Sequence, residues 1–213
     1  MLGKKEADQI IKKRFGDLLK PLGFKWIAKE GCFFRKRDGV GDMFVIGHVN
    51  YTTVQKIRCT IGLRFDRVEE IRDEVLGYTP LPSRVSISTP VDYFAGRFLE
   101  WVCESAAELE AAIDEIAAQY MPKVVEHFER YRDPIAMLGK VDDRNGAQSF
   151  TFADDVFAAI SVLILQWLYQ RDGFEDRVKA YRQRFAQYVP EVMAPFETIV
   201  NWLRSHPESR GQS

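Results

Sequence analysis

The segment from Ile57 to Phe65 constrains the fold of this chain more than any other. Apolar side chains alternate there with polar or small ones over the whole run. One set is Ile57, Cys59, Ile61, Leu63 and Phe65, and the other is Arg58, Thr60, Gly62 and Arg64. Successive side chains of a strand point to opposite faces of a sheet, so the pattern predicts a central strand with one buried face. A half-buried strand of this kind is typical of an antiparallel sheet.

A helix and further strands surround this strand in the sequence. Apolar residues recur at helical spacing from Ala7 to Leu22 with lysines between them, and Pro21 and Gly23 end the pattern. Short β-strands are expected at Phe24–Ala28 and Cys32–Arg37, a longer one at Met43–Val54, and further strands at Arg84–Ser88 and Arg97–Cys103. The N-terminal part is therefore a helix followed by a β-meander.

The C-terminal half carries helix signals. Ser105-Ala-Ala-Glu108 is a capping box that opens a helix running to about Tyr131, and Pro122 should kink or split that helix. A short helix is also expected at Val68–Leu76. Residues 134–150 are interpreted as a connector. Thr151 is predicted to begin a helix that ends near Gly173, and two more helical segments are predicted to meet at Pro190.

These elements predict an α+β fold in which the N-terminal helix packs on an antiparallel β-meander, followed by a helical C-terminal half. The 213 residues suit one large domain, or a domain with a packed extension. We expect an α+β domain with the antiparallel sheet at residues 1–135, and a helical extension packed on it at residues 136–213.

Charge is unevenly distributed along the chain. Residues 1–66 hold 14 Lys and Arg against 7 Asp and Glu, a net charge of +7, whereas residues 67–213 hold 16 against 24, a net charge of −8. One interpretation is that the two parts face each other or are simply solvated. The other is that the basic part meets an anionic partner, with an acidic protein favoured over nucleic acid.

The cysteines and the apolar segments indicate the compartment. Cys32, Cys59 and Cys103 are odd in number and widely spaced, which argues against a disulfide framework and favours the reducing cytoplasm. The N-terminal residues lack the apolar region of a signal peptide. The most apolar run, Val156–Leu168, is too short to span a bilayer, so we expect a buried helix and no membrane partner.

The motifs of catalysis, metal binding and cofactor binding are missing from the sequence. Gly39-Val-Gly41 lacks the third glycine of a dinucleotide loop and reads as a hairpin turn. The histidines His48, His127 and His206 have no further ligand at zinc spacing beyond chance neighbours. We therefore expect no catalytic residue, no metal site and no cofactor.

A basic sheet face is the one candidate binding site. If Cys59 and Ile61 face the core, the opposite face displays arginines with an aromatic residue between them. The expected site residues are Phe33, Arg35, Arg37, His48, Arg58 and Arg64. Such a surface binds carboxylates, phosphates or nucleic-acid strands. The alternative is that the acidic helices of the same chain cover this face.

The N-terminal part resembles an uncharacterised bacterial domain-of-unknown-function family. The resemblance rests on the Leu18–Phe24 corner (Leu-Leu-Lys-Pro-Leu-Gly-Phe), on Phe33-Phe-Arg35, on the meander that ends at Ile57–Phe65, and on the helix Glu108–Tyr131 with Pro122 inside it. It covers residues 5–135, and it implies a bacterial cytoplasmic α+β fold without an assigned activity.

The leading functional hypothesis is therefore a non-enzymatic binding or interaction protein, immunity- or antitoxin-like, that blocks another protein. The alternative is an enzyme or nucleic-acid-processing protein whose site lies on the basic sheet face around His48. A third hypothesis is a module that binds a small ligand. A deep pocket that holds His48 with a carboxylate would favour the enzyme, whereas an exposed apolar patch would favour the partner binder.

Overall fold

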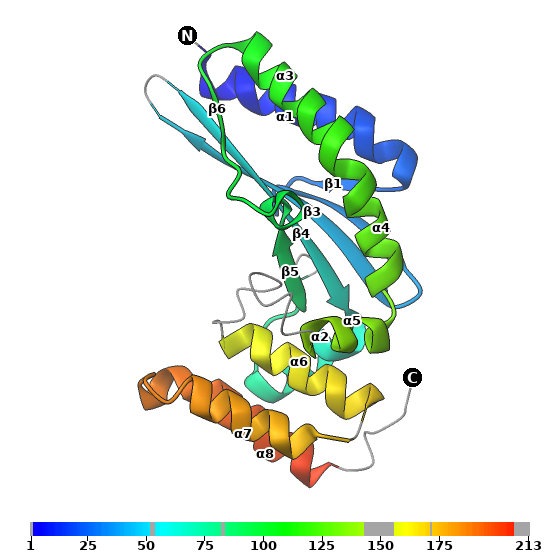
Figure 1. The fold of residues 1–213 in the computed structure, drawn as a ribbon, viewed down its shortest axis with the longest axis vertical. Helices are drawn as coiled ribbons and strands as arrows, with labels where there is room; N and C mark the ends of the chain where they lie inside the picture. Colours follow the sequence, from blue (N-terminus) through cyan, green and yellow to red (C-terminus); the bar gives the residue numbers. More distant parts are fainter. Residues whose placement is uncertain (1, 52–53, 82–83, 143–155, 171, 207–213) are drawn as a thin grey trace. The chain divides into compact units, whose positions relative to one another are not determined.

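The computed structural model describes residues 2–51, 54–81, 84–142, 156–170 and 172–206. It confirms the predicted α+β class, with an N-terminal helix, a six-stranded antiparallel sheet and a helical C-terminal half (Figure 1). The helices are α1 (Lys4–Leu19), α2 (Asp66–Leu76), α3 (Ala106–Glu115), α4 (Met121–Tyr131), α5 (Pro134–Asp142), α6 (Val156–Tyr169), α7 (Phe174–Arg184) and α8 (Pro190–Ser205). The strands are β1 (Lys25–Ile27), β2 (Cys32–Arg37), β3 (Val40–Asn50), β4 (Gln55–Phe65), β5 (Ile87–Pro90) and β6 (Trp101–Cys103).

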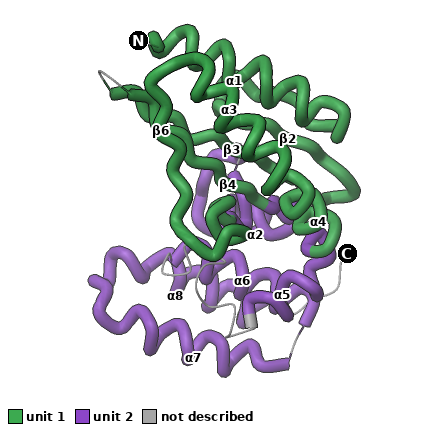
Figure 2. The backbone as a smooth tube through the Cα atoms, turned by 45° about the horizontal axis from the view of Figure 1, so that its top comes forward, with its two compact units in different colours: residues 1–62, 89–130 green, residues 63–88, 131–213 purple. Residues whose placement is uncertain are grey.

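The chain divides into two compact units (Figure 2). Unit 1 comprises residues 1–62 and 89–130, and unit 2 comprises residues 63–88 and 131–213. The sequence placed a single boundary near residue 135, whereas the structure also groups residues 63–88 with the C-terminal helices. The reason is that α2 packs against α6 and α8.

The sheet of unit 1 has a simple order in which β1, β2, β3 and β4 are neighbours and β6 pairs with β4. Trp26 lies opposite Phe33, and Phe33 lies opposite Phe44 on the next strand, so these three side chains share one face. The ring of Phe15 on α1 lies 5.4 Å from that of Phe44, centre to centre. Helix α1 therefore covers this face, and α3 lies beside α1 (Figure 1).

The facing of β4 agrees with its sequence pattern. The side chains from Ile57 to Phe65 that the alternation assigns to the core are 4% exposed or less, and Arg58 is exposed. The prediction of a half-buried strand is therefore confirmed, because the period of two is a local property of the extended backbone.

The helix that begins after Ser105 is capped as predicted. The backbone N–H of Glu108 donates to Oγ of Ser105 at 3.3 Å, and the carboxylate of Glu108 accepts from the N–H of Glu104 at 2.7 Å. The predicted helix is divided near Pro122, where a π-helical segment (Ile116–Tyr120) joins α3 to α4. A π turn changes the hydrogen-bond spacing locally, which accommodates a residue without an N–H.

Unit 2 is built around α6. Ten of its residues are buried, and it contacts α2, α5, α7 and α8. The expected connector after Pro134 begins as helix α5, because the Asp133 carboxylate accepts from the N–H groups of Ile135 and Ala136. The predicted cap at Thr151 lies outside the described residues. In the described ranges, no helix combines the length and the apolarity needed to cross a membrane.

Candidate functional site

Arg35 and Arg37 share one buried carboxylate. Nε of Arg35 donates to Oδ2 of Asp42 at 2.7 Å, and Nη2 of Arg37 donates to the same oxygen at 2.9 Å. The Asp42 side chain is only 2% exposed. Glu129 of α4 accepts a further bond from Nη1 of Arg37 at 2.7 Å. Both arginines therefore form ion pairs with acidic side chains of the same chain.

The side chain of Arg35 also links the turn that follows α1 to the sheet. Its Nη1 donates to the backbone oxygen of Leu22 at 2.9 Å, and its guanidinium carbon lies 4.7 Å from the centre of the Phe24 ring. Burial raises the pKa of Asp42 by more than the two arginines lower it. We call Arg35, Arg37, Asp42 and Glu129 the arginine cluster, and its contacts are those of a buried structural network.

His48 lies near the end of β3 with both ring nitrogens engaged. Its Nδ1 is 2.9 Å from Oδ1 of Asp8, and its Nε2 is 2.6 Å from Oε1 of Gln55. The Gln55 amide nitrogen donates to the backbone oxygen of Leu2 and to the side chain of Asn50, which leaves Oε1 as the acceptor. A general base needs a free ring nitrogen within reach of its substrate, and this arrangement offers none.

The remaining two predicted arginines lie elsewhere. Arg58 projects on the sheet face opposite to Phe33, where its guanidinium carbon lies 4.5 Å from the Phe98 ring centre and its Nη2 lies 3.5 Å from Asp92. Arg64 belongs to unit 2, where its guanidinium bonds to the Asp66 carboxylate and to backbone oxygens.

The six residues expected on one basic face are therefore not brought together. Phe33, Arg35 and Arg37 do share a face, as alternation requires, but α1 and α4 cover it and Phe33 is only 2% exposed. His48 contacts Gln55, which shares a strand face with Ile57, so Arg58 points the other way. A shift of one residue in the assumed register reverses the face of every side chain.

A groove of about 700 Å³ lies between α1 and the edge strand β1. Its floor is aromatic: Phe24 and Phe33 are buried, Trp26 is partly exposed, and the rings of Trp26 and Phe33 lie 4.9 Å apart. The lining residues are Gln9, Lys12, Lys13, Gly16, Asp17, Lys20, Phe24, Lys25, Trp26 and Phe33. We call this feature the α1 groove.

The pattern of α1 explains why the groove stays open. Its buried stripe is Ala7, Ile11, Phe15 and Leu19, at helical spacing. On one side of the stripe, Arg14 pairs with Asp114 of α3. The other side of the helix carries Gly16, and a Cβ built there meets no atom within 4 Å. That flank of α1 therefore forms an uncovered wall.

Four of the lining residues are lysines, namely Lys12, Lys13, Lys20 and Lys25. All four are exposed, and Nζ of Lys12 lies 6.0 Å from the centre of the Trp26 ring. Ion pairs between described residues engage none of these lysines. Among the described residues of the lining, Asp17 is the one acidic residue, so they carry a net positive charge. An anionic ligand with apolar side chains matches this surface.

Sequence reasoning missed the α1 groove. Its lining comes from α1, β1 and β2, so it depends on packing that no single segment shows. One signal was local: Gly16 interrupts an amphipathic helix, where glycine costs stability, and lysines follow the same flank.

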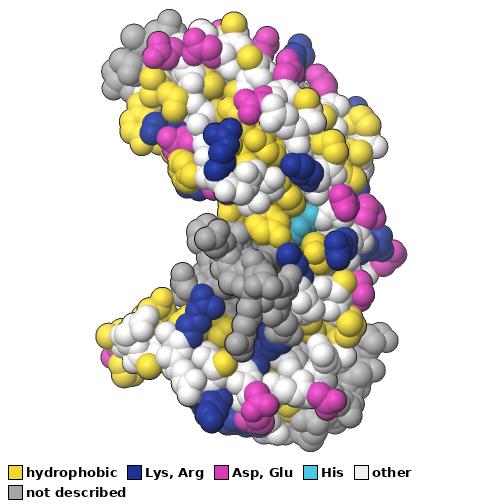
Figure 3. Space-filling view, viewed as in Figure 1, with side chains coloured by type: hydrophobic (Ala, Val, Ile, Leu, Met, Phe, Trp, Pro, Cys, Tyr) yellow, Lys and Arg dark blue, Asp and Glu magenta, His cyan; other side chains and the backbone are white. Residues whose placement is uncertain are grey.

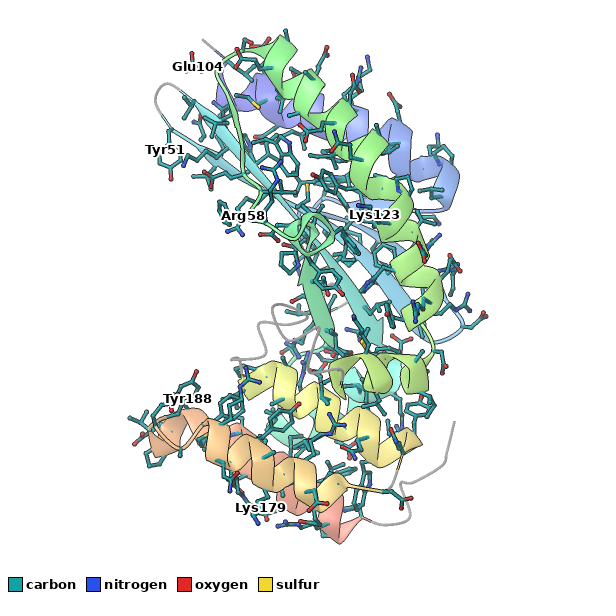
Figure 4. The ribbon with its side chains drawn as sticks, viewed as in Figure 1. Tyr51, Arg58, Glu104, Lys123, Lys179 and Tyr188 are labelled. Atoms are coloured by element: carbon teal, nitrogen blue, oxygen red, sulfur yellow. The ribbon has the colours of Figure 1, made fainter. Side chains whose placement is uncertain are left out.

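A second exposed region lies on the sheet face that bears Arg58. Four large apolar side chains there are at least 50% exposed, namely Val49, Tyr51, Phe98 and Val102. Figure 4 shows Tyr51 and Arg58 on the side of the sheet away from α1 and α3, and Figure 3 shows apolar side chains with Lys and Arg among them on this side of unit 1. Its cations already stack: Lys56 lies over Tyr51 and pairs with Glu100, and Arg58 lies over Phe98.

Unit 2 holds a buried charged network on α2. Arg72 pairs with Glu69, whose other oxygen accepts from Oγ of Ser86 at 2.8 Å, and Asp73 pairs with Arg84. Glu69 has no exposed surface, and burial raises its pKa even though arginines surround it. A shifted pKa is one mark of a functional site, but a carboxylate closed off in this way cannot reach a substrate.

Metal and thiol chemistry find little support in the described ranges. Among these residues, no three His, Cys, Asp or Glu side chains gather as a metal site would require. The three cysteines are free and buried, and burial raises the pKa of the Cys32 thiol to about 11 and that of Cys59 further. Reactive cysteines have lowered pKa values, so these thiols are inert.

In comparisons with known proteins, no family model matches the chain, and neither does a curated protein or a solved structure. The resemblance to a bacterial family therefore stays a prediction. The function is therefore inferred from the α1 groove of unit 1.

Proposed function

We propose that this protein is a non-enzymatic binding protein that holds an acidic segment of a partner protein in the α1 groove. The observation that carries the proposal is an open aromatic groove whose rim bears lysines without an ion pair in the described part of the chain. Concave apolar surfaces with a few charged groups at the rim are typical of binding sites for polypeptides and ligands.

The groove favours a binding protein over an enzyme. Its lining, in the part of the chain that the structure describes, holds no histidine or cysteine and one carboxylate, that of Asp17. His48 does not line it. General acid–base catalysis needs paired groups that exchange a proton, and the groove lining does not supply them.

The groove also favours a protein over a nucleic acid. Single-stranded nucleic acids stack on exposed aromatic faces, and here only Trp26 is partly exposed while Phe24 and Phe33 are buried in the floor. The arginines, which suit bidentate phosphate contacts, are engaged in the arginine cluster. The available cations are lysines, which act as point charges and match scattered carboxylates.

The biological setting forms part of the same proposal. We place the protein in the cytoplasm of a bacterium, as an immunity- or antitoxin-like protein that blocks its partner. Buried free thiols suit a reducing compartment, and the resemblance of residues 5–135 supports the bacterial setting.

Site-specific photo-crosslinking in cells of the native host tests the proposal. p-Benzoyl-phenylalanine replaces Lys13 on the groove rim in one variant and Val102 on the opposite sheet face in the other; both positions are exposed. We expect irradiation to join a discrete partner protein to the Lys13 variant and not to the Val102 variant.

A second substitution in the crosslinking variants provides the control. Gly16→Trp places a large side chain in the groove, and Gly16→Ala leaves it open, because a Cβ at Gly16 has free space. The crosslink should disappear with Gly16→Trp and persist with Gly16→Ala, with neither variant melting below the parent protein. A product that survives Gly16→Trp, or that forms equally at Val102, would overturn the proposal.

A further inference from the structure

We infer that the segment bound in the α1 groove is an amphipathic α-helix of the partner, with acidic residues beside its apolar stripe. The inference rests on the proposed function and specifies what the groove recognises. It follows from the architecture of unit 1, the position of Gly16 and the distribution of the lysines.

The architecture of unit 1 leaves a helix position open. One face of an α+β sheet is covered by helices packed side by side. Here α1 has α3 on one flank, whereas its other flank borders the groove over β1 and β2. The side chains of the floor, Trp26 and Phe33, are cross-strand neighbours on the covered face. A helix laid beside α1 would cover this part of the sheet.

The dimensions of the groove match a short helix. The α1 wall extends from Gln9 to Lys20, which corresponds to about 16 Å at the rise of an α-helix. Three helical turns span this length and present apolar side chains at i, i+3 or i+4, and i+7 on one face. An incoming stripe of this kind would rest on the Phe24, Trp26 and Phe33 floor.

Gly16 lies in the α1 wall, between Lys12 and Lys20 along the helix. Packed helices approach to 8–10 Å between axes, and the smaller side chains at the contact permit the closer distances. Gly16 has no side chain and no neighbour within 4 Å of the place where a Cβ would stand. Gly16 therefore allows the backbone of a second helix to pack close to α1.

Three of the lysines lie on the wall that α1 forms, namely Lys12, Lys13 and Lys20. Lys25 is also part of the lining, but it neighbours Trp26 on β1, so its side chain starts from the opposite face of the strand. A helix in the groove has cations along its α1 side, so carboxylates beside its apolar stripe complete the pairs. Charge complementarity of this kind selects the partner and speeds association.

An extended strand fits less well. A strand would add to the free edge of β1, which has only three residues and therefore a length of about 10 Å. Strand addition uses the backbone edge, whereas the groove opens over the aromatic side chains of the sheet face. The groove therefore contacts the side chains of a bound segment and not its backbone edge.

Synthetic peptides of about 12 residues test the inference on the full chain. The probe is a hydrocarbon-stapled helix with leucines at i, i+4 and i+7 and glutamates beside this leucine stripe. One control carries lysines in place of the glutamates, and the other replaces the central leucine turn with proline and lacks the staple. Affinity is measured by fluorescence anisotropy, and amide shifts near Gly16 and Trp26 by NMR locate the site.

The acidic helix should bind at least about tenfold more tightly than either control, and Gly16→Trp should abolish binding while Gly16→Ala retains it. Equal affinity for the three peptides, or binding that survives Gly16→Trp, would overturn the inference. Tighter binding of oligo-deoxythymidine at the same amides, with a steep salt dependence, would overturn it in favour of a nucleic acid.

The proposed function can stand if this inference fails. Mass spectrometry of the Lys13 crosslink identifies the partner segment that touches the groove. A crosslinked segment that is extended in the partner would refute the helix and keep the binding protein. A helical segment with acidic flanks would support both.

Discussion

The arginine cluster and the α1 groove are both basic and aromatic, yet the fold uses them in opposite ways. In the arginine cluster, Arg35 and Arg37 converge on Asp42, which is 2% exposed. In the α1 groove, the lysines stand exposed around Trp26, with no ion pair in the described ranges. Charge counts along the sequence do not separate these two regions, because availability depends on which acids the fold places beside each cation.

The difference assigns separate roles to the two kinds of cation. A planar guanidinium can serve a buried carboxylate, a backbone oxygen and an aromatic ring at once, as Arg35 does. A lysine on a helix flank keeps its ammonium hydrated and free to meet a partner. We therefore expect the arginines to determine stability and the lysines to determine binding.

The largest expected effect comes from removing Arg35. Arg35→Ala leaves the buried Asp42 with only Arg37 beside it, and breaking a buried ion pair costs about 3–5 kcal/mol. Lys13→Ala is the matched control, and an exposed change of this kind stays within about 0.5 kcal/mol. Urea unfolding monitored by circular dichroism measures both. Similar losses of unfolding free energy in the two variants would contradict the different roles assigned to the arginine cluster and the α1 groove.

The pH dependence of stability sharpens the same contrast. Burial raises the folded pKa of Asp42 above its ordinary value of 3.8, so the folded state binds more protons than the unfolded state between 3.8 and the raised pKa. The contribution of Asp42 to the unfolding free energy therefore falls as pH rises through this window. Arg35 opposes the rise in pKa, so Arg35→Ala raises it further.

The gap in unfolding free energy between the parent and Arg35→Ala should consequently widen as pH rises from about 4, by about 1.4 kcal/mol for each unit by which the two folded pKa values differ. Urea titrations at a series of pH values measure it. The Arg35→Ala, Asp42→Asn double variant lacks the titrating carboxyl group. The difference in unfolding free energy between it and the Asp42→Asn single variant should therefore not change with pH. A pH-independent difference in unfolding free energy between the parent and Arg35→Ala would contradict this prediction.

A smaller effect, of opposite sign, is expected at Gly16. Glycine costs a helix interior roughly 0.5–1 kcal/mol relative to alanine, and a Cβ at this position meets no atom within 4 Å. Gly16→Ala should therefore raise the unfolding free energy by about this amount. Gly139 of α5, which also has open space at its Cβ, is the control for helix propensity alone. A destabilised Gly16→Ala would show that the groove wall is already in contact.

Much of the fold follows from local sequence patterns. The period of two in β4 and the capping box at Ser105 each involve residues close together in the chain, so backbone geometry alone decides them. The helix at α5 was missed although its cap was visible: Asp133 precedes Pro134, and their order is that of a helix start. Residues 143–150 of the expected connector lie outside the described residues.

The site could be predicted only in part. Alternation correctly placed Phe33, Arg35 and Arg37 on one strand face, but the choice between an outer and a covered face depends on α1 and α4. Contacts such as Arg37 with Glu129 join residues far apart in the chain, and no local pattern specifies them. The sequence did indicate the alternative that proved relevant here, namely that acidic residues of the same chain occupy the basic face.

The most direct test of the account measures affinity and stability together in two variants, with the photo-crosslinked partner as ligand. The Lys13→Glu, Lys20→Glu double variant should lose at least about tenfold in affinity at an unchanged melting temperature, because exposed charges contribute to association and little to folding. Arg35→Ala should melt at a lower temperature and, where still folded, bind like the parent. Parental affinity in the lysine variant, or lost affinity in folded Arg35→Ala, would contradict the central claim that the groove lysines and not the clustered arginines meet the partner.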